Sequence, residues 1–304
     1  MRKILRRIWR SVLLFLLVLL MLVTYPFYWL AMKLVNRFGT EYIRCRNGNI
    51  QLPIVTYHAK KNGRTLMFAP TIPLADPEYY AELNKLVRIH QTCGYSILHD
   101  KIRPLTKEQR LKLQPAEWEA KRQLQAVYAG LRWIKQVIGL ASQPRSLPYR
   151  KNRQEWQNVD MSEVEFLARV SATKSYFFKQ IPDFKKPEQV SDLTKWVLTK
   201  LFNKLVLVAM AFELYVRFSK KRSKLWQIVI NSRNEIGHIG LNRVQSGNIF
   251  MLWGVDRYSD MNAVLNSIGY KIVNKRWVSA YQLRKTGWRV PLRLAWQFII
   301  KQKK

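Results

Sequence analysis

The side chains in this chain that could bind a metal or act as general acids and bases are few and widely spaced. The histidines and the best-placed aspartates are His58, His90, His99, His238, Asp76, Asp100 and Asp256. No two of them show a compact ligand spacing such as the HExxH of a zinc helix. Cys45 and Cys93 lack the CxxC spacing of a metal or redox motif, and their sequence context leaves open whether they pair.

His99 and Asp100 are the most promising neighbours, because they end a predicted strand and functional groups of an α/β sheet gather at the carboxyl ends of strands. Adjacent strand residues point to opposite faces, so we expect the two side chains to enter different environments. We expect His99 to be half-buried and hydrogen-bonded, and His90 to pack on its helix. The chain has no G-x-S-x-G elbow, P-loop or dinucleotide fingerprint, and Cys93 lies at a helix end.

Local patterns predict the elements that position these residues. An Asn-Gly turn signal at 62–63 lies between two apolar segments and predicts a hairpin over residues 50–70. An Asp-Pro-Glu sequence at 76–78 combines an N-cap, a first-turn proline and a favourable acidic charge, and predicts a helix start. Gly94 is the expected end of that helix, before a short strand at 95–99.

The rest of the chain alternates in the same way. From Thr106 to about residue 222 the pattern is mostly helical, and the apolar stretch 205–212 is too short to cross a bilayer, so we expect a buried helix there. The later elements are strands at 226–230 and 249–253, a helix at 259–268 and an extended segment at 270–283. The predicted fold class is α/β (α+β), with a mixed sheet in two halves separated by a helical insertion over about 106–222.

Several short motifs resemble the TraB/PrgY/GumN family and follow its order. The segment 71–80, TIPLADPEYY, is similar to the family's first signature, a Gly-x-x-His loop before a helix that opens with Asp-Pro-Glu-Tyr-Tyr. Further matches to the family's next strand, its Tyr-Trp and Asp-Met segment, its Arg-Asn pair and its second Gly-x-x-His loop are residues 96–102, 149–161, 233–234 and 253–270. The resemblance covers most of residues 50–283 and implies a TraB/GumN-like α/β domain.

The resemblance also implies a metal-dependent, peptidase-like hydrolase whose site centres on the two loop histidines. In this chain those positions are Pro73 and Arg257. Proline has no side-chain lone pair to bind a metal, and a permanently charged guanidinium repels a divalent cation. We therefore expect no metal, no cofactor and no catalytic residue at these positions.

What remains of the family's pocket is a set of charged and polar residues. Asp100 stands where the family has glutamate, and an Arg-Asn pair is retained at 233–234. The candidates for this vestigial pocket are Asp100, Arg233, Asn234, Asp256 and Arg257. We expect them to form a buried ion-pair cluster, with a site for an anionic ligand as the alternative.

The N-terminus predicts a single-pass membrane anchor. A basic flank at residues 1–11 precedes an uncharged run at 12–32, which at about 1.5 Å per helical residue is long enough for a hydrocarbon core of about 30 Å. Aromatic residues at the end of the run suit a bilayer interface, and no cleavage-site pattern follows, so we expect the anchor to stay uncleaved. Residues 33–49 are the expected juxtamembrane linker. A slight basic excess before the span favours a cytoplasmic N-terminus with the main domain across the membrane.

The net charge of +34 indicates partners rather than a fold. No acidic residue follows Asp260, and residues 284–304 form a basic tail. The expected contacts of this tail with anionic lipid headgroups are Arg284, Lys285, Arg289 and Arg293. Nucleic acid is the competing partner, because Trp277, Trp288 and Trp296 interleave with the basic residues, but no nucleic-acid motif accompanies them.

These observations predict a membrane-anchored TraB/GumN-like pseudoenzyme that binds or regulates a peptide or protein partner and contacts anionic lipid. One alternative is an active hydrolase or peptidase that uses a site different from that of the family. The other is a basic, membrane-associated nucleic-acid-binding protein.

Overall fold

A computed structural model describes residues 25–26, 29–37, 41–149, 155–173, 186–218, 231–244 and 247–283. The strands are β1 (Arg44–Arg46), β2 (Asn49–Ala59), β3 (Arg64–Thr71), β4 (Leu74–Ala75), β5 (Ser96–His99), β6 (Ala141–Ser142), β7 (Trp156–Asn158), β8 (Ile249–Gly254) and β9 (Tyr270–Gln282). The helices are α2 (Pro77–Thr92), α3 (Lys107–Leu111), α4 (Pro115–Ile138), α5 (Gln143–Ser146), α6 (Glu163–Ala172), η1 (Pro187–Gln189), α7 (Asp192–Phe218), α9 (Arg233–Arg243), η3 (Val255–Arg257) and α10 (Tyr258–Ser267).

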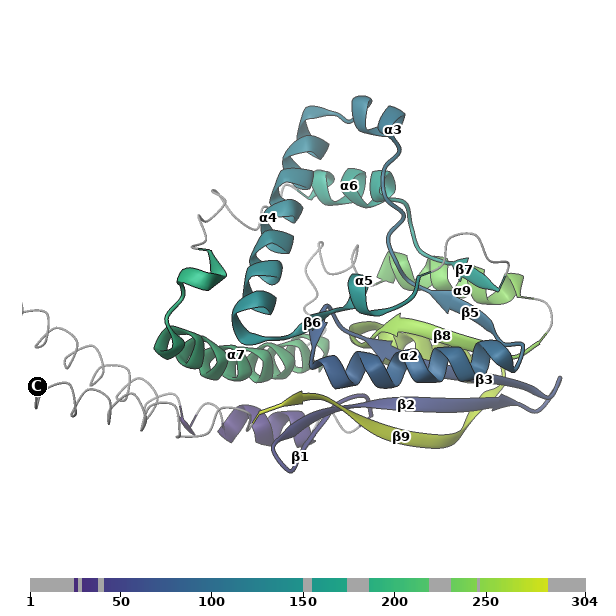
Figure 1. The fold of residues 1–304 in the computed structure, drawn as a ribbon. Helices are drawn as coiled ribbons and strands as arrows, with labels where there is room; N and C mark the ends of the chain where they lie inside the picture. Colours follow the sequence, from purple (N-terminus) through teal and green to yellow (C-terminus); the bar gives the residue numbers. More distant parts are fainter. Residues whose placement is uncertain are drawn as a thin grey trace, which may run out of the picture.

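Seven of the described strands form one mixed sheet, which confirms the α/β (α+β) fold class (Figure 1). β2 and β3 form the predicted hairpin, with Ala59 opposite Arg64 and a positive φ of 68° at Gly63 that suits glycine. β9 pairs with β2 along the whole length of β2, so β1 and β3 occupy the other edge of that strand. β3, β8, β5 and β7 then follow in that order and run parallel.

β8 is the central strand of the parallel part, although it comes late in the chain. Its residues 249–253 are all buried, as expected for a strand that pairs on both edges and is covered on both faces. Because β3, β8, β5 and β7 point the same way, their carboxyl ends meet at one edge of the sheet. We call this the carboxyl edge.

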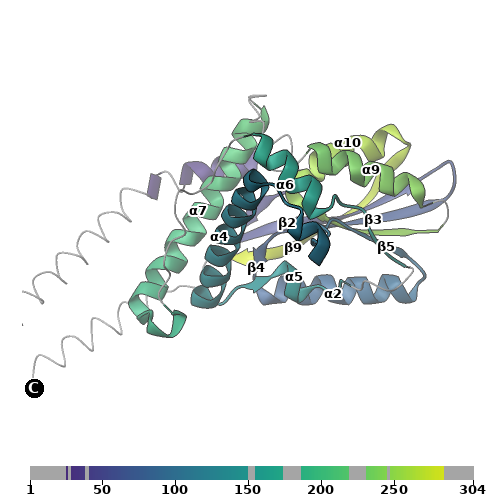
Figure 2. The same ribbon diagram turned by 90° about the horizontal axis from the view of Figure 1, so that it is seen from above.

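Helices cover both faces of the sheet: α2 lies on one face, and α9 and α10 lie on the other (Figure 2). α2 begins at Pro77 as predicted and buries its apolar stripe of Tyr79, Tyr80, Leu83 and Val87. Asp76 occupies the N-cap position, but its carboxylate does not cap the helix. It accepts a hydrogen bond from the backbone N–H of Gln282 at 2.8 Å, which ties the start of α2 to the end of β9.

The predicted insertion is mainly helical, but it also contributes strands. β7 pairs with β5 and extends the main sheet, and β6 pairs with β4. These strands are two or three residues long, too short to show an alternating pattern. α4 and α6 pack on each other around a small core of their own that includes the fully buried Met161 and Leu167.

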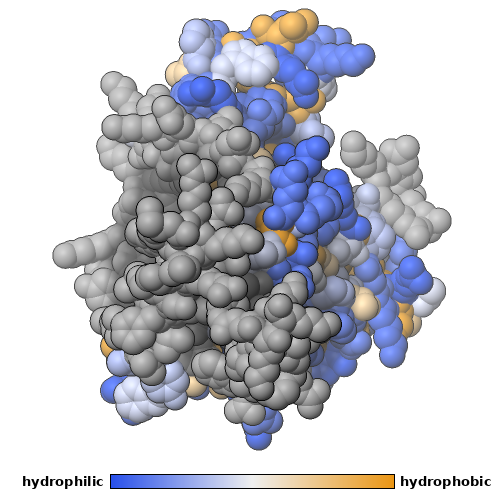
Figure 3. Space-filling view, turned by 60° about the vertical axis from the view of Figure 1, so that its left-hand side comes forward, coloured by the Kyte–Doolittle hydropathy of each residue, from blue (hydrophilic) through white to orange (hydrophobic). Residues whose placement is uncertain are grey.

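The α3 and α4 end of the insertion projects away from the sheet (Figure 1). In the space-filling view, apolar side chains lie among hydrophilic ones at this end (Figure 3). Leu111 is strongly exposed there. The apolar stretch 205–212 lies within α7, where Leu207 is fully buried.

The structure describes only part of the predicted membrane segment and none of the predicted basic tail. Residues 12–24, the predicted strand at 226–230 and the tail at 284–304 lie outside the described residues. No helix among the described residues is both long and apolar enough to span a bilayer. The predicted linker at 33–49 holds the end of a helix at 29–37 and the strand β1, and its Val35 and Ile43 belong to the main core. This segment is therefore part of the domain.

Candidate functional site

Loops from several strands meet at the carboxyl edge. β5 ends at His99 and is followed by Asp100, β7 leads to Asp160, and β8 leads through Gly254 to Arg257. α9, which follows the insertion in the sequence, brings its first residues, Arg233 and Asn234, to the carboxyl edge. The structure thus assembles segments that lie far apart in the sequence.

Arg257 and Asp100 form an ion pair in the interior. Asp100 Oδ2 accepts from Arg257 Nη2 and also from the backbone N–H of Gly254 at 2.6 Å. The exposed fractions of Arg257 and Asp100 are only 2% and 4%. Burial lowers the pKa of Arg257 to about 9, so the guanidinium is still charged at neutral pH. Its charged plane lies 4.6 Å from the ring centroid of Trp253, a cation–π distance.

A second pair joins the first through the backbone. Arg233 Nε lies 3.0 and 3.1 Å from the two carboxylate oxygens of Asp160, and Nη2 also bonds Asp160 Oδ2. The same Nη2 donates to the carbonyl of Asp100 at 2.8 Å. Although burial opposes it, the hydrogen bonds that Arg233 donates to Asp160, together with the negative charge of Asp160, raise the pKa of Arg233. Arg233 therefore holds the loops after β5 and β7 together.

Asn234 positions the Trp253 ring, on which the Arg257 guanidinium lies. Its Oδ1 accepts from Trp253 Nε1 at 3.2 Å, and its Nδ2 lies 3.4 Å from Asp260 Oδ2. Asp256 lies on the outer side, with Oδ1 3.9 Å from Arg257 Nε. The five predicted pocket residues therefore do come together. Arg257 pairs with Asp100 and, at longer range, with Asp256, Arg233 pairs with Asp160 and contacts the Asp100 carbonyl, and Asn234 holds Trp253.

The cluster is paired but not saturated. Arg257 Nε and Nη1 and Asp100 Oδ1 are buried and have no hydrogen-bond partner among the described residues. Buried polar atoms of this kind are normally satisfied by protein groups or by water. Two donor groups and one acceptor atom thus remain without a hydrogen-bond partner among the described residues.

Pro73 and Arg257, the two positions that the sequence resemblance aligns with loop histidines, follow neighbouring parallel strands. Thr71 at the end of β3 pairs with Gly254 at the end of β8, and Pro73 and Arg257 come two and three residues later. Pro73 is exposed and contributes its carbonyl to the backbone N–H of Gln143 at 3.1 Å. Neither side chain supplies a lone pair that could bind a metal.

His99 lies on the opposite side of β5 from Asp100, inside an aromatic cluster. Its ring centroid is 4.9 Å from that of Tyr149 and 6.0 Å from that of Trp156. The expectation of a half-buried histidine is wrong, because His99 is buried. Its Nδ1 has no hydrogen-bond partner among the described residues. Burial, with a smaller effect of Lys101, lowers the pKa of His99 to about 4.

This buried histidine predicts an acid-sensitive fold. The folded-state pKa of about 4 lies below the ordinary value of 6.5, so the unfolded chain takes up a proton first as the pH falls. The contribution of His99 is complete above pH 6.5 and is lost between pH 6.5 and 4, by about 3 kcal/mol. Urea unfolding at a series of pH values should show this loss, and His99→Phe should flatten the curve over that range. An unchanged slope in the variant would contradict the assignment.

The other candidates have structural roles. His90 packs its ring on Tyr95 and Phe250 and bonds the carbonyl of Leu86 at 2.8 Å, as predicted. His238 Nε2 contacts Asn242 at 3.3 Å on α9. Among the described residues no group of three His, Cys, Asp or Glu side chains could hold a metal ion. Cys45 and Cys93 are both free.

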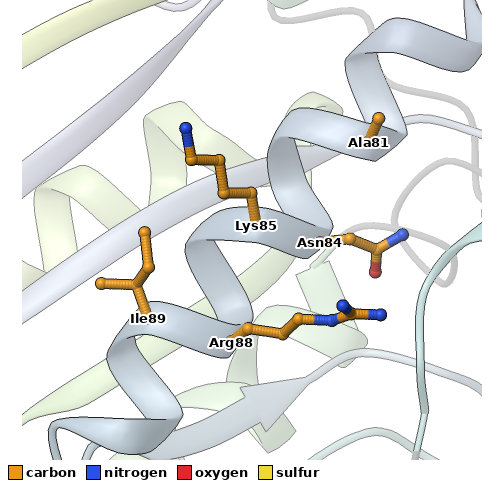
Figure 4. Close-up of a pocket in the computed structure, with 5 residues that line it drawn as sticks. All are labelled: Ala81, Asn84, Lys85, Arg88 and Ile89. Carbon is orange, nitrogen blue, oxygen red and sulfur yellow. The ribbon is translucent and has the colours of Figure 1, made fainter.

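An open depression of about 440 Å³ lies on the surface of α2, lined by Ala81, Asn84, Lys85, Arg88 and Ile89 (Figure 4). All five residues come from one helix, and none belongs to the carboxyl-edge cluster. Asn84 reaches across to the carbonyl of Ser146 in α5. We regard this depression as a surface feature separate from the candidate site.

Sequence reasoning identified Asp100 and the Arg-Asn pair, but not the partner of Arg233. Asp160 belongs to the Asp-Met segment of the resemblance. The chain has only 19 acidic residues beside 53 basic ones, and this imbalance was the available signal that a buried acidic residue would pair with an arginine. Trp253 was also missed as the surface on which Arg257 stacks.

Comparison with known proteins adds no relative, since no family model, curated protein or solved structure matches the chain. The chemistry of the site must therefore be derived from its own residues. Those residues provide a buried guanidinium and carboxylate that neutralise each other, with three further buried polar atoms beside them that have no hydrogen-bond partner among the described residues.

Proposed function

We propose that the protein is a membrane-anchored pseudoenzyme: a TraB/GumN-like scaffold that binds or regulates a peptide or protein partner, without metal-dependent hydrolysis. The observation that carries this proposal is the ion pair between Arg257 and Asp100. It fills the carboxyl edge at the position where the resemblance places the second metal-binding histidine.

The topology supports a scaffold of this kind. The two loops that resemble the family's Gly-x-x-His signatures follow the adjacent parallel strands β3 and β8. The Asp-Met and Arg-Asn segments meet in the Asp160–Arg233 pair, so motifs that match separately in the sequence are in contact in space.

The electrostatics argue for binding rather than metal chemistry. A divalent ion beside Arg257 would face a permanent positive charge at close range in an environment of low dielectric constant. Asp100, the nearest carboxylate, already neutralises that charge and accepts the Gly254 N–H. A second positive ion would have to compete for the same oxygen.

The anchor and the orientation are part of the proposal. The uncharged run at 12–32 would supply a single membrane span whose last residues leave the bilayer, because Ala31 belongs to the core of the folded domain. The N-terminus would be cytoplasmic and the folded domain would lie on the other side. The basic tail at 284–304 would contact anionic lipid.

Metal analysis tests the proposal directly. We expect the purified full chain in mild detergent to contain no stoichiometric divalent metal and to unfold at the same temperature with or without EDTA. The full chain is required because Ala31 and Val35 belong to the core. About one equivalent of zinc or manganese, together with a lower melting temperature after chelation, would overturn the pseudoenzyme proposal and favour an active hydrolase.

A further inference from the structure

We infer that the end of the domain next to the anchor forms a cationic surface that binds the anionic lipid headgroups of the membrane in which the anchor sits. Its residues are Lys33, Arg44, Arg46 and Lys275, with Trp277 between two of them. The inference rests on the proposed anchor and adds a specific lipid-contacting face of the folded domain, apart from the tail.

The domain is fastened directly to the end of the predicted span. Met32, the last residue of that span, has its sulfur 3.7 Å from the Sγ of Cys45 in the middle of β1. Asn36 Oδ1 accepts from the backbone N–H of Cys45 at 2.8 Å. Ala31 and Val35 are buried in the core that contains the sheet. Figure 1 shows the short N-terminal helical segment lying beside β1. The sheet therefore begins where the predicted span ends.

The other side of this helical segment has the composition of a bilayer interface. Tyr25 and Trp29 have exposed fractions of 63% and 48%, and Leu30 is also exposed. Lys33 Nζ lies 3.7 Å from the ring centroid of Trp29. Aromatic rings and a basic residue at the end of a span are typical of the headgroup level. At 1.5 Å per residue, Val35 is about 9 Å from Trp29 along the helix, so the core begins within the headgroup region.

The strands beside this helix present further positive charges. Arg44 and Arg46 flank Cys45 in β1, so their side chains share the face of the strand opposite to the Cys45 thiol that contacts Met32. Desolvation and the neighbouring Arg46 both lower the pKa of Arg44, a sign of positive charges held close together. An anionic headgroup would relieve this repulsion.

Trp277 fixes two of these cations in place. The Arg44 guanidinium lies 4.3 Å from its ring centroid and Lys275 Nζ lies 5.1 Å from it. Arg44 also donates to Gln51 Oε1 at 2.7 Å. The Trp277 ring is half-buried and engaged with two cations, so it is a poor platform for stacking a base. This geometry favours lipid over nucleic acid as the partner of the surface.

The test uses the full chain in lipid nanodiscs made of phosphatidylcholine alone or with one third phosphatidylglycerol. Because a ligand that binds only the folded state raises its melting temperature, the anionic discs should raise that of the wild-type protein by about 3 °C or more. A triple variant, Arg44→Gln, Arg46→Gln and Lys275→Gln, should lose at least half of this difference. High salt should remove it by screening.

The matched control removes two positive charges far from the anchor. Lys85→Gln with Arg88→Gln on the surface of α2 should keep the full difference. Each variant is compared with itself in neutral discs, so a change in intrinsic stability does not affect the result. If the wild-type protein shows no difference, or if the triple variant keeps it, the surface does not bind lipid. Alkaline carbonate extraction tests the anchor separately: release of the protein would refute the anchor, whatever the nanodiscs show.

Discussion

Replacing Arg257 by methionine is expected to destabilise the domain by about 3–5 kcal/mol, because the substitution leaves the buried carboxylate of Asp100 without its counter-charge. Methionine approximates the volume of the lost side chain, so the effect reports on charge more than on packing. Urea unfolding of the full chain in detergent, followed by tryptophan fluorescence, measures the change.

Two further variants test whether the loss of stability comes from the unpaired buried charge. Adding Asp100→Asn to Arg257→Met removes the stranded charge, keeps an oxygen for the Gly254 N–H, and should restore most of the lost stability. Arg276→Met breaks an ion pair with Glu82 in which the arginine is 50% exposed, and should cost less than about 1 kcal/mol. Equal costs for the two single variants would show that the buried pair is not a structural element.

Gly237→Ala is expected to destabilise the domain by about 2 kcal/mol or more, although alanine is the better helix former by about 1 kcal/mol. A Cβ at this position would lie 2.2 and 2.3 Å from two ring atoms of Trp253. Trp253 is fully buried and is held by Asn234 on its indole N–H and by Arg257 on its ring face. The ring has nowhere to move without disturbing the charged cluster.

The control for this variant lies on the same helix. Ile239 is exposed on α9, so Ile239→Ala should change stability by no more than about 0.5 kcal/mol. Thermal melts of both variants supply the comparison. A stable Gly237→Ala protein would mean that α9 does not pack as closely on Trp253 as the structure indicates.

The elements that could be predicted are those with strong local signals. The hairpin around Gly63, the helix that follows Asp76 and the helix that ends before Gly269 are all confirmed, because turn and cap residues act over a few positions. α9 could not be predicted in the same way. Two of its residues, Gly237 and Gly240, are poor helix formers, and they are present because Trp253 and Val159 approach the helix axis closely. That reason is visible only in three dimensions.

The sequence could predict which residues belong to the candidate site, but not which of them form ion pairs with each other. Asp100 and Arg257 are 157 positions apart in numbering and become neighbours only because β5 and β8 are adjacent parallel strands. The position of β8 between β3 and β5 is set by the whole sheet, so no local pattern could assign the partner of Arg257. The short strand β7 and the partnership of Asp160 with Arg233 were hidden for the same reason.

The placement of β8 also has a consequence for biosynthesis. β3 and β5 are made early, yet each has an edge that only β8 covers, and β2 has an edge covered by β9 near the end of the described chain. The edges of β3 and β5 stay open until β8 has been made, and the edge of β2 stays open until β9 has been made, so in the meantime they can pair with another chain. A protein tethered by its N-terminus would hold such nascent edges near the membrane for most of its synthesis. A chaperone that covers exposed strands would be needed most in that interval, before the last strands close the sheet.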